Sequence, residues 1–395
     1  MSTAKSKESY ADADEGQTDS PARRGGHVAL YMQSFTGGGA ERVMVNLALG
    51  LAARGLRVDL VVARAEGPYL SLVTPDIRLI DLQCQRSLTS LPGLVRYLGR
   101  ERPDALLSAL GQSNLIALAA AAVARFQGRV VISIHTHLSG HYRHAAGAKN
   151  QIFLHLCRRF YRRADAIVAV SHEAATDLKQ AFGLPPDRVR MIYNPVVSPA
   201  LFLSAKEPVE HPWFIQGQPP VVLAVGRLCE QKDFLTLLRA FAQVRSCLPA
   251  RLLILGEGPS RSQLEAAVSE LGLSDSVALP GFVANPYSYM ARAAVYALSS
   301  RWEGLPTVLI EALACGVPVI STDCPSGPRE ILRDGRYGSL VPVGDVNALA
   351  RSLEEVLRGG GLPAPKESWA AFETVRAVAN YERVLLGAGG APEKT

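Results

Sequence analysis

Two carboxylates flank an uncharged turn in the second half of the chain. Glu303 and Glu311 stand eight positions apart, and the residues between them read Gly-Leu-Pro-Thr-Val-Leu-Ile. Carboxylates on both sides of such a turn can each accept hydrogen bonds from the hydroxyl groups of a sugar. The purely structural alternative is that Glu303 caps a helix and that Glu311 is solvated.

The residues around the glutamates predict a strand, a loop and a helix. The apolar segment 294–300 is typical of a buried strand, and 307–314 has a helical pattern, with Pro306 in its first turn and a stop at Gly316. The first backbone amides of a helix have no partners within it and attract anions. We therefore expect a phosphate to meet the amides of Gly304, Leu305, Thr307 and Val308.

Three other loops offer groups that can bind a ligand. Gly38 and Gly39 follow the first predicted strand, where glycine lets the backbone approach an anion, although such a run can equally form a tight turn. Arg227 and Lys232 follow the first strand of the second half and suit a diphosphate, unless they are ordinary surface charges. Phe282 lies on a third loop of this kind.

Four histidines cluster after another predicted strand. They are His135, His137, His141 and His144, and any of them could point into a ligand site. His135 and His137 could share one face of an extended segment, but a third metal ligand at a firm spacing is missing. The six cysteines show no CxxC spacing, which favours a reduced cytosolic compartment. We therefore expect no metal site.

Short apolar segments alternate with helical patterns, and the alternation occurs twice. This order predicts two doubly wound parallel sheets whose strand-end loops face one cleft. The predicted strands are 27–32, 58–63, 104–110, 129–135 and 165–171 in the first half, and 220–226, 250–258, 276–281, 294–300 and 318–322 in the second.

Composition and periodicity divide the chain into five parts. We expect a polar, disordered tail over 1–25, a first domain over 26–197, a second domain over 198–366, a helix over 367–386 and a second disordered tail over 387–395. The helix must bury its apolar face against a domain. That face consists of Trp369, Phe372, Val375, Val378, Ala379, Val384 and Leu385.

The net charge of +6 is concentrated in the first half. Residues 26–200 contain 20 Lys and Arg against 11 Asp and Glu, whereas residues 201–366 contain 15 against 16. Basic and aromatic residues do not alternate as a single-strand binder requires, so we expect no nucleic acid partner. No apolar run reaches the length of a membrane span.

The segment 145–164 predicts an amphipathic basic helix. It contains five cations and no acid, and a helical projection separates its arginines from one apolar arc. The cations are Lys149, Arg158, Arg159, Arg162 and Arg163, and the apolar arc contains Ile152, Phe153, Leu154, Leu156, Cys157, Phe160 and Tyr161. Such a helix can be packed on a core with a solvated face, or it can bind an anionic membrane surface.

Taken together, these motifs closely resemble glycosyltransferase family 4, a family of retaining, sugar-nucleotide-dependent enzymes with the two-domain GT-B fold. The resemblance is carried by GGGAERVMVNLA, VGRLCEQKDFLTLLRAF, LLILGEGPSRSQLE and SRWEGLPTVLIEALACGVPVIST. It covers the chain from His27 to about Leu386, and Glu303 and Glu311 fit the family's Glu-x7-Glu motif.

The resemblance implies a role for each candidate residue. Glu303 would contact the donor sugar, and Glu311 the ribose of the nucleotide. Arg227 and Lys232 would hold the diphosphate and stabilise the leaving group. Further implied positions are Gly38 and Gly39 beside the donor phosphate, Phe282 beside the base and His135 facing the sugar. No metal or other cofactor is implied, and the last helix would cross back onto the first domain.

The resemblance thus implies transfer of a hexose or N-acetylhexosamine from a nucleoside diphosphate, with UDP favoured over GDP. With the basic helix, we expect a peripheral protein on the inner face of a bacterial cytoplasmic membrane. Its acceptor would be a lipid-linked glycan in surface-polysaccharide assembly. The alternatives are a catalytically silent sugar-nucleotide-binding scaffold and an epimerase of the same fold. The intact charged residues disfavour the scaffold, and the family-specific segment 303–320 disfavours the epimerase.

Overall fold

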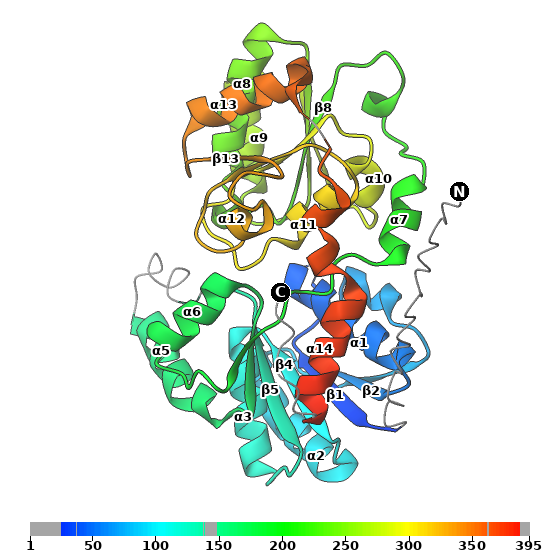
Figure 1. Ribbon diagram of the computed structural model, residues 1–395, viewed down its shortest axis with the longest axis vertical. Helices are drawn as coiled ribbons and strands as arrows, with labels where there is room; N and C mark the ends of the chain where they lie inside the picture. The colour runs from blue at the N-terminus through cyan, green and yellow to red at the C-terminus, as the bar shows by residue number, and fades with distance from the viewer. Residues whose placement is uncertain (1–24, 37, 137, 139–147, 362, 388–395) are drawn as a thin grey trace, which may run out of the picture.

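Two parallel sheets form two α/β domains that lie one above the other (Figure 1). The computed structural model describes residues 25–36, 38–136, 138, 148–361 and 363–387, with the side chains of 148 and 149 left out. The expected tails, except for their residues 25 and 387, and His137, His141 and His144 lie outside these ranges.

The N-terminal domain contains a seven-stranded sheet in the order β3-β2-β1-β4-β5-β6-β7. All of its strand pairs are parallel, as expected for strands buried on both faces. The strands are β1 (His27–Met32), β2 (Arg57–Val62), β3 (Ile77–Asp81), β4 (Ala105–Ala109), β5 (Arg129–Ile134), β6 (Ala166–Ala169) and β7 (Val189–Met191).

Successive side chains of each strand enter two different cores. On β1, Tyr31 packs on one face of the sheet, and Leu30 packs on the other. The helices that cover the two faces are α1 (Gly39–Ala53), α2 (Leu91–Glu101), α3 (Gly111–Val123), α5 (Ala148–Phe160) and α6 (His172–Gln180), with short 3-10 turns at Pro68–Leu72, Ser87–Ser90 and Tyr161–Arg163.

The C-terminal domain repeats this scheme with a six-stranded sheet in the order β10-β9-β8-β11-β12-β13. Its strands are β8 (Val221–Val225), β9 (Arg251–Leu255), β10 (Val277–Gly281), β11 (Val295–Leu298), β12 (Val319–Thr322) and β13 (Ser339–Val341). Its helices are α7 (Pro199–Lys206), α8 (Phe234–Cys247), α9 (Arg261–Glu270), α10 (Tyr287–Met290), α11 (Thr307–Ala314), α12 (Pro328–Ile331) and α13 (Val346–Glu355), with short turns at Pro212–Phe214, Glu230–Lys232 and Val356–Gly360.

The last helix, α14 (Thr374–Leu386), leaves the C-terminal domain and packs against α1 and β5 of the N-terminal domain (Figure 1). The segment before it is not one continuous helix, because two 3-10 turns, Lys366–Ser368 and Ala370–Phe372, precede Glu373 in extended conformation. The expected apolar face is therefore divided. Phe372 packs in the C-terminal core and Leu385 in the N-terminal core.

One expectation for this segment was wrong, and one buried residue was missed. Val375 is 70 % exposed, because the helix restarts at Thr374 and turns Val375 away from both domains. Tyr381 was not expected on the buried face, but it is almost fully buried. Among the described residues, no helix combines the length and apolar character that crossing a bilayer requires.

Candidate active site

A cleft of about 660 Å³ lies between the two domains, at the carboxyl ends of both sheets. Loops after β1 and β5 line it from the N-terminal domain, and loops after β8, β10 and β11 line it from the C-terminal domain. This is where open α/β sheets bind ligands. Within the described part of the chain, all the candidate site residues named from the sequence line this cleft.

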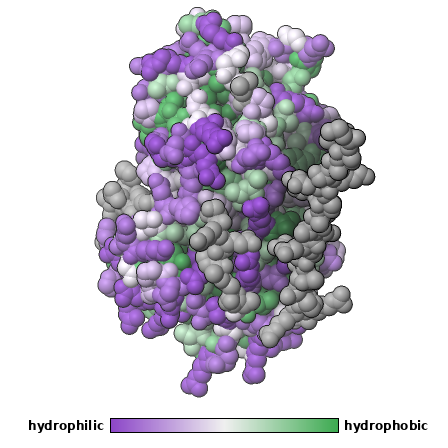
Figure 2. Space-filling view, in the orientation of Figure 1, coloured by the Kyte–Doolittle hydropathy of each residue, from purple (hydrophilic) through white to green (hydrophobic). Residues whose placement is uncertain are grey.

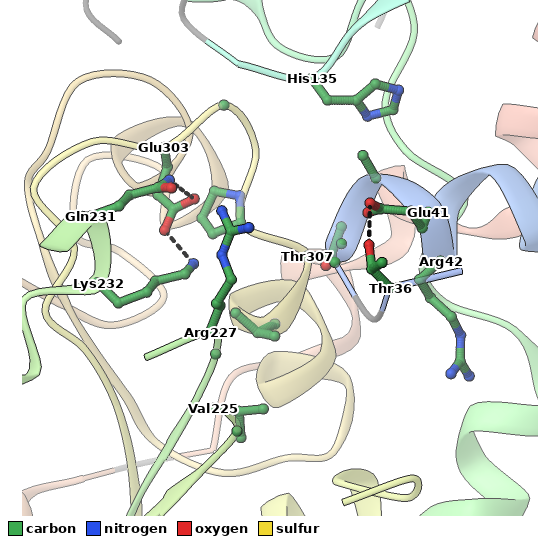
Figure 3. A pocket seen from close by; sticks show the side chains of 18 of the residues that line it. Thr36, Glu41, Arg42, His135, Val225, Arg227, Gln231, Lys232, Glu303 and Thr307 are labelled. Atoms are coloured by element: carbon green, nitrogen blue, oxygen red, sulfur yellow. Dashed lines mark hydrogen bonds and ion pairs between the residues drawn. The ribbon is translucent and has the colours of Figure 1, made fainter. Parts of the chain in front are cut away.

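An ion pair joins the β8 and β11 loops on one side of the cleft (Figure 3). Lys232 Nζ lies 2.6 Å from Glu303 Oε1, and both side chains are largely shielded from solvent. The Ser300 hydroxyl donates to the same Glu303 oxygen at 2.6 Å. Ser299 Oγ donates to the Lys232 carbonyl at 2.7 Å, which fixes the short turn that carries the lysine. The carboxylate and the ammonium are thus held before any ligand binds.

Arg227 extends from the same β8 loop without an anionic partner. Its side chain lines the cleft and is exposed, and within the described ranges it forms no ion pair. Its planar guanidinium is therefore available to an anionic ligand that enters beside Lys232.

Two helix N-termini meet across the cleft. α11 begins at Thr307 after Pro306, and no side chain caps its first amides. α1 begins at Gly39, also without a side-chain cap, and a Cβ at Gly39 would lie 3.3 Å from Thr307 Oγ1. The positive ends of both helix dipoles therefore converge on one space, which suits a phosphate.

Glu311 is buried on the second turn of α11. Its carboxylate accepts a hydrogen bond from the Tyr287 hydroxyl at 3.2 Å and is only 7 % exposed. Burial raises the pKa of Glu311, and the nearby Arg42 partly opposes this rise. The alternative in which Glu311 is merely solvated was wrong, because α11 packs against α10 and leaves Glu311 buried on the cleft wall.

Arg42 of the N-terminal domain lies close enough to lower the pKa of this carboxylate by its charge. Its guanidinium lies between two aromatic rings, 5.3 Å from the centroid of Tyr69 and 5.8 Å from that of Tyr287. Its Nε is buried and has no hydrogen-bond partner in the described structure. Tyr69 also meets Phe282 edge to face, with ring centroids 6.3 Å apart, so aromatic residues of both domains close this end of the cleft.

His135 follows β5 and faces the cleft from the N-terminal domain (Figure 3). Its Nε2 lies 2.9 Å from Ser133 Oγ, and its Nδ1 is buried without a partner in the described ranges. Burial lowers the pKa of His135 to about 4, so the imidazole is neutral at physiological pH. The three neighbouring histidines lie outside the described residues, so of the four only His135 can be placed in the cleft.

Gly304 brings the two domains into direct contact. A Cβ at this position would lie 2.1 Å from the His135 carbonyl oxygen and 2.6 Å from its carbon, both on the opposite domain. We expect Gly304→Ala to hold the domains apart and to lower kcat/KM at least tenfold, because a misplacement of about 1 Å can cost 100-fold in rate. Steady-state kinetics with a thermal melt checks this, and an unchanged kcat/KM would show that this close approach is not needed.

No metal centre is evident in the described residues, which include no group of three His, Cys, Asp or Glu side chains placed to hold an ion. The expectation that the reaction needs neither metal nor another cofactor stays a prediction.

Comparisons with known proteins agree with this geometry. A family model described as Glycosyltransferase Family 4 matches residues 37–197, and one described as Glycosyl transferases group 1 matches residues 206–368. The chain is 31 % identical over 387 residues to a Campylobacter jejuni enzyme, N-acetylgalactosamine-N,N'-diacetylbacillosaminyl-diphospho-undecaprenol 4-alpha-N-acetylgalactosaminyltransferase. The match covers 91 % of this chain and 99 % of that enzyme. The chain belongs to glycosyltransferase family 4.

Two further comparisons give a second relative and a similar solved structure for this family 4 glycosyltransferase. It is 27 % identical to the lipopolysaccharide core biosynthesis glycosyltransferase LpsE of Rhizobium meliloti, over 82 % of this chain and 87 % of that protein. Its fold is similar to the crystal structure of Anabaena Alr3699/HepE in complex with UDP and glucose, with a TM-score of 0.73 and 21 % identity, over 91 % and 99 % of the two chains. The predicted GT-B fold is confirmed.

The loops that line the site could be predicted from the sequence, but the contacts between their side chains could not. The sequence placed Glu303, Lys232 and Glu311 in one site, and the structure brings them to one cleft. It missed Arg42, because a single arginine at the start of a helix resembles an ordinary surface charge. Tyr69 and Tyr287, the two aromatic residues whose rings contact Arg42, were also missed. The individual roles of all these residues stay predictions.

Proposed function

We propose that this glycosyltransferase moves a hexose or N-acetylhexosamine from a nucleoside diphosphate to an acceptor hydroxyl, with retention at the anomeric carbon. The observation that carries the proposal is that the N-termini of α1 and α11 meet across the cleft, with Lys232 and Arg227 lining the same cleft. Such an arrangement suits two phosphates. UDP is the favoured nucleotide, with support from the UDP bound in the similar Anabaena structure.

The two carboxylates would each hold one end of the donor. Glu311 would accept hydrogen bonds from the ribose hydroxyls, and the Tyr69 and Phe282 end of the cleft would hold the base. Glu303 would accept hydrogen bonds from the transferred sugar, on whose other side His135 stands. These assignments place the anomeric carbon between the diphosphate and the N-terminal domain, where the acceptor approaches.

The reaction would be a front-face displacement. The bond between the anomeric carbon and the diphosphate oxygen breaks while the acceptor oxygen forms a bond on the same face, and the acceptor proton moves to the departing phosphate. Negative charge accumulates on the diphosphate as it leaves. Lys232, Arg227 and the two helix N-termini would stabilise that charge, and Lys232 is already held in place by Glu303.

A lipid-linked glycan is the favoured acceptor. The printed name of the Campylobacter relative specifies a saccharide on diphospho-undecaprenol, and the Rhizobium relative acts in lipopolysaccharide core biosynthesis. We therefore place the reaction in bacterial surface-glycan assembly. The acceptor side of the cleft would be formed by the β1 and β5 loops of the N-terminal domain.

Transfer assays test this proposal directly. The purified protein is incubated with UDP-GalNAc, UDP-GlcNAc, UDP-Glc or GDP-Man and with a polyprenyl diphosphate that carries an N-acetylhexosamine disaccharide. Transfer with an α-linked product, established by NMR from an α-linked donor, is expected for at least one UDP-sugar. Binding without turnover would indicate a scaffold, interconversion of the sugar an epimerase, and a β-linked product an inverting enzyme.

The surface of α5 supports a membrane-bound site of action. Ile152 is 60 % exposed and Leu156 37 % exposed, whereas Cys157 of the same predicted apolar arc is buried. The basic residues Arg158, Arg159, Arg162 and Arg163 are exposed nearby, and hydrophilic side chains cover much of this domain in the view of Figure 2. Exposed apolar side chains beside exposed cations suit the headgroup region of an anionic bilayer.

α5 lies next to the cleft. A Cβ at Gly111, which lines the cleft, would lie 2.6 Å from the Phe153 ring on α5. We therefore propose that the protein is peripheral on the inner face of the cytoplasmic membrane, with α5 on the bilayer and the acceptor side of the cleft near it. Lys149 was predicted to contribute to this surface, but its side chain lies outside the described part.

Replacing Arg158, Arg159, Arg162 and Arg163 together with Gln should reduce sedimentation with anionic liposomes at least tenfold, because each cation near such a surface contributes about 1 kcal/mol. Binding of the parent protein should also weaken with salt. The matched control replaces the exposed Arg333, Arg336, Arg351 and Arg358 of the C-terminal domain with Gln, an equal change in charge. Equal loss in both variants, or no binding by the parent, would contradict the assignment of α5.

A further inference from the structure

A chain of hydrogen bonds connects His135 to the C-terminal helix. His135 Nε2 lies 2.9 Å from Ser133 Oγ, and the same hydroxyl lies 3.0 Å from the Tyr381 hydroxyl on α14. Ser133 and Tyr381 are almost fully buried, between β5 and the helix that arrives from the other domain. The helix therefore places one polar group directly behind the cleft.

The direction of these hydrogen bonds follows from the number of protons. Each hydroxyl has one proton to donate, and the Tyr381 hydroxyl has no other hydrogen-bond partner among the described residues. A buried tyrosine proton without an acceptor is costly, so Tyr381 must donate to Ser133. Ser133 then has its own proton left for His135 Nε2, which must be the accepting, unprotonated nitrogen.

The protonation of the imidazole is then determined. With a pKa of about 4, His135 carries a single ring proton at neutral pH. Because Nε2 accepts from Ser133, that proton lies on Nδ1, the nitrogen that has no partner in the described structure. The reverse direction would place the proton on Nε2 and leave the tyrosine proton without an acceptor.

We propose that Tyr381 is a positioning residue, which acts through Ser133 to hold neutral His135 as the Nδ1-protonated tautomer, so that the imidazole can donate a hydrogen bond to a hydroxyl oxygen of the donor sugar. The part concerning the sugar rests on the proposed function. The inference gives the crossing helix a role in the site beyond joining the two domains. A sugar hydroxyl is a suitable acceptor, because it offers lone pairs to an N–H donor.

The test compares Tyr381→Phe with a matched control, Tyr31→Phe. Both tyrosines are buried in the N-terminal domain and both bond to a serine hydroxyl, since Tyr31 lies 2.5 Å from Ser90 Oγ, but Tyr31 is not among the residues that line the cleft. Tyr381→Phe should weaken UDP-sugar binding about five- to tenfold, the effect of about one hydrogen bond, and leave UDP binding unchanged. Tyr31→Phe should change neither affinity.

Two additional measurements separate positioning from loss of stability. Nitrogen-15 NMR of histidine-labelled protein, with His135 assigned by its absence in His135→Gln, should show Nδ1 protonated in the parent and mixed tautomers in Tyr381→Phe. Ser133→Ala should match Tyr381→Phe, and the double variant should be no worse than either, because the residues act as one chain.

An Nε2-protonated His135 in the parent protein would overturn the proposal, as would equal effects of Tyr381→Phe and Tyr31→Phe on UDP-sugar binding. If the parent binds no sugar nucleotide, the proposed function fails and the sugar contact fails with it. The NMR measurement still decides whether the hydrogen-bonded chain sets the tautomer.

Discussion

Replacing Lys232 with alanine should lower kcat by about 100- to 1,000-fold while changing the affinity for UDP less than tenfold. The lysine is already fixed 2.6 Å from Glu303 and shielded from water, so its charge acts in a medium where it is strong. That charge matters most when the diphosphate departs with its full negative charge. Removing it should therefore affect the transition state more than the bound donor.

The comparison needs kcat and the UDP dissociation constant from the same preparation. Lys206→Ala is the matched control, because Lys206 is an exposed lysine at the end of α7 outside the cleft. Arg227→Ala should have a smaller effect than Lys232→Ala, since Arg227 is exposed and solvent screens its charge. A kcat of Lys232→Ala within about twofold of the parent would exclude the assigned role in charge stabilisation.

The pattern of apolar segments alone was sufficient to predict two parallel sheets, because parallel strands buried on both faces are continuously apolar. The strands that the sequence did not reveal are β3, β7 and β13, all near sheet edges. β3 reads Ile-Arg-Leu-Ile-Asp, and its Arg78 pairs with the buried Asp59 of β2. An edge strand that mixes apolar and charged residues has a weak hydrophobic signal, because only part of it is buried.

The candidate site was likewise only partly predictable from the sequence. Loops that follow predicted strands could be assigned to the cleft, because topology brings strand ends together. Contacts between distant segments could not be assigned, since they depend on how the two domains and the last helix pack together. Arg42 and Tyr287 are 245 positions apart in the sequence, and Ser133 and Tyr381 are 248 apart. No local pattern predicts pairs at such separations.

The buried carboxylate of Glu311 makes the stability of the fold depend on pH. Burial raises its pKa, so its ionised form is disfavoured in the folded protein. A carboxyl group whose folded pKa is above its unfolded pKa stabilises the fold most at low pH, and this contribution is lost as pH rises through the folded pKa. Above that pH the ionised Glu311 opposes folding, and the cation of Arg42 relieves only part of the cost.

Glu311→Gln should therefore weaken UDP binding about 100-fold without lowering the Tm of the ligand-free protein at neutral pH. The loss of affinity follows because a hydrogen bond to a charged, buried acceptor contributes about 1.5 to 3 kcal/mol. The Tm should be retained because Gln removes the cost of a buried charge while it keeps the contact with Tyr287. Arg42→Met should raise the pKa of Glu311 further, because the cation that lowers it is lost, so that on acidification UDP binding weakens at a higher pH than in the parent.

Calorimetric titration with UDP and thermal melts from pH 5 to 8 measure all three proteins under the same conditions. The parent should lose stability with rising pH through the folded pKa of Glu311, and Glu311→Gln should lack that component. If Glu311→Gln binds UDP within about threefold of the parent and melts at a lower temperature, the carboxylate is a structural partner of Tyr287 and Arg42 and not the ribose contact. Because the affinity for UDP is expected to fall while the Tm is retained, a single variant separates these two roles.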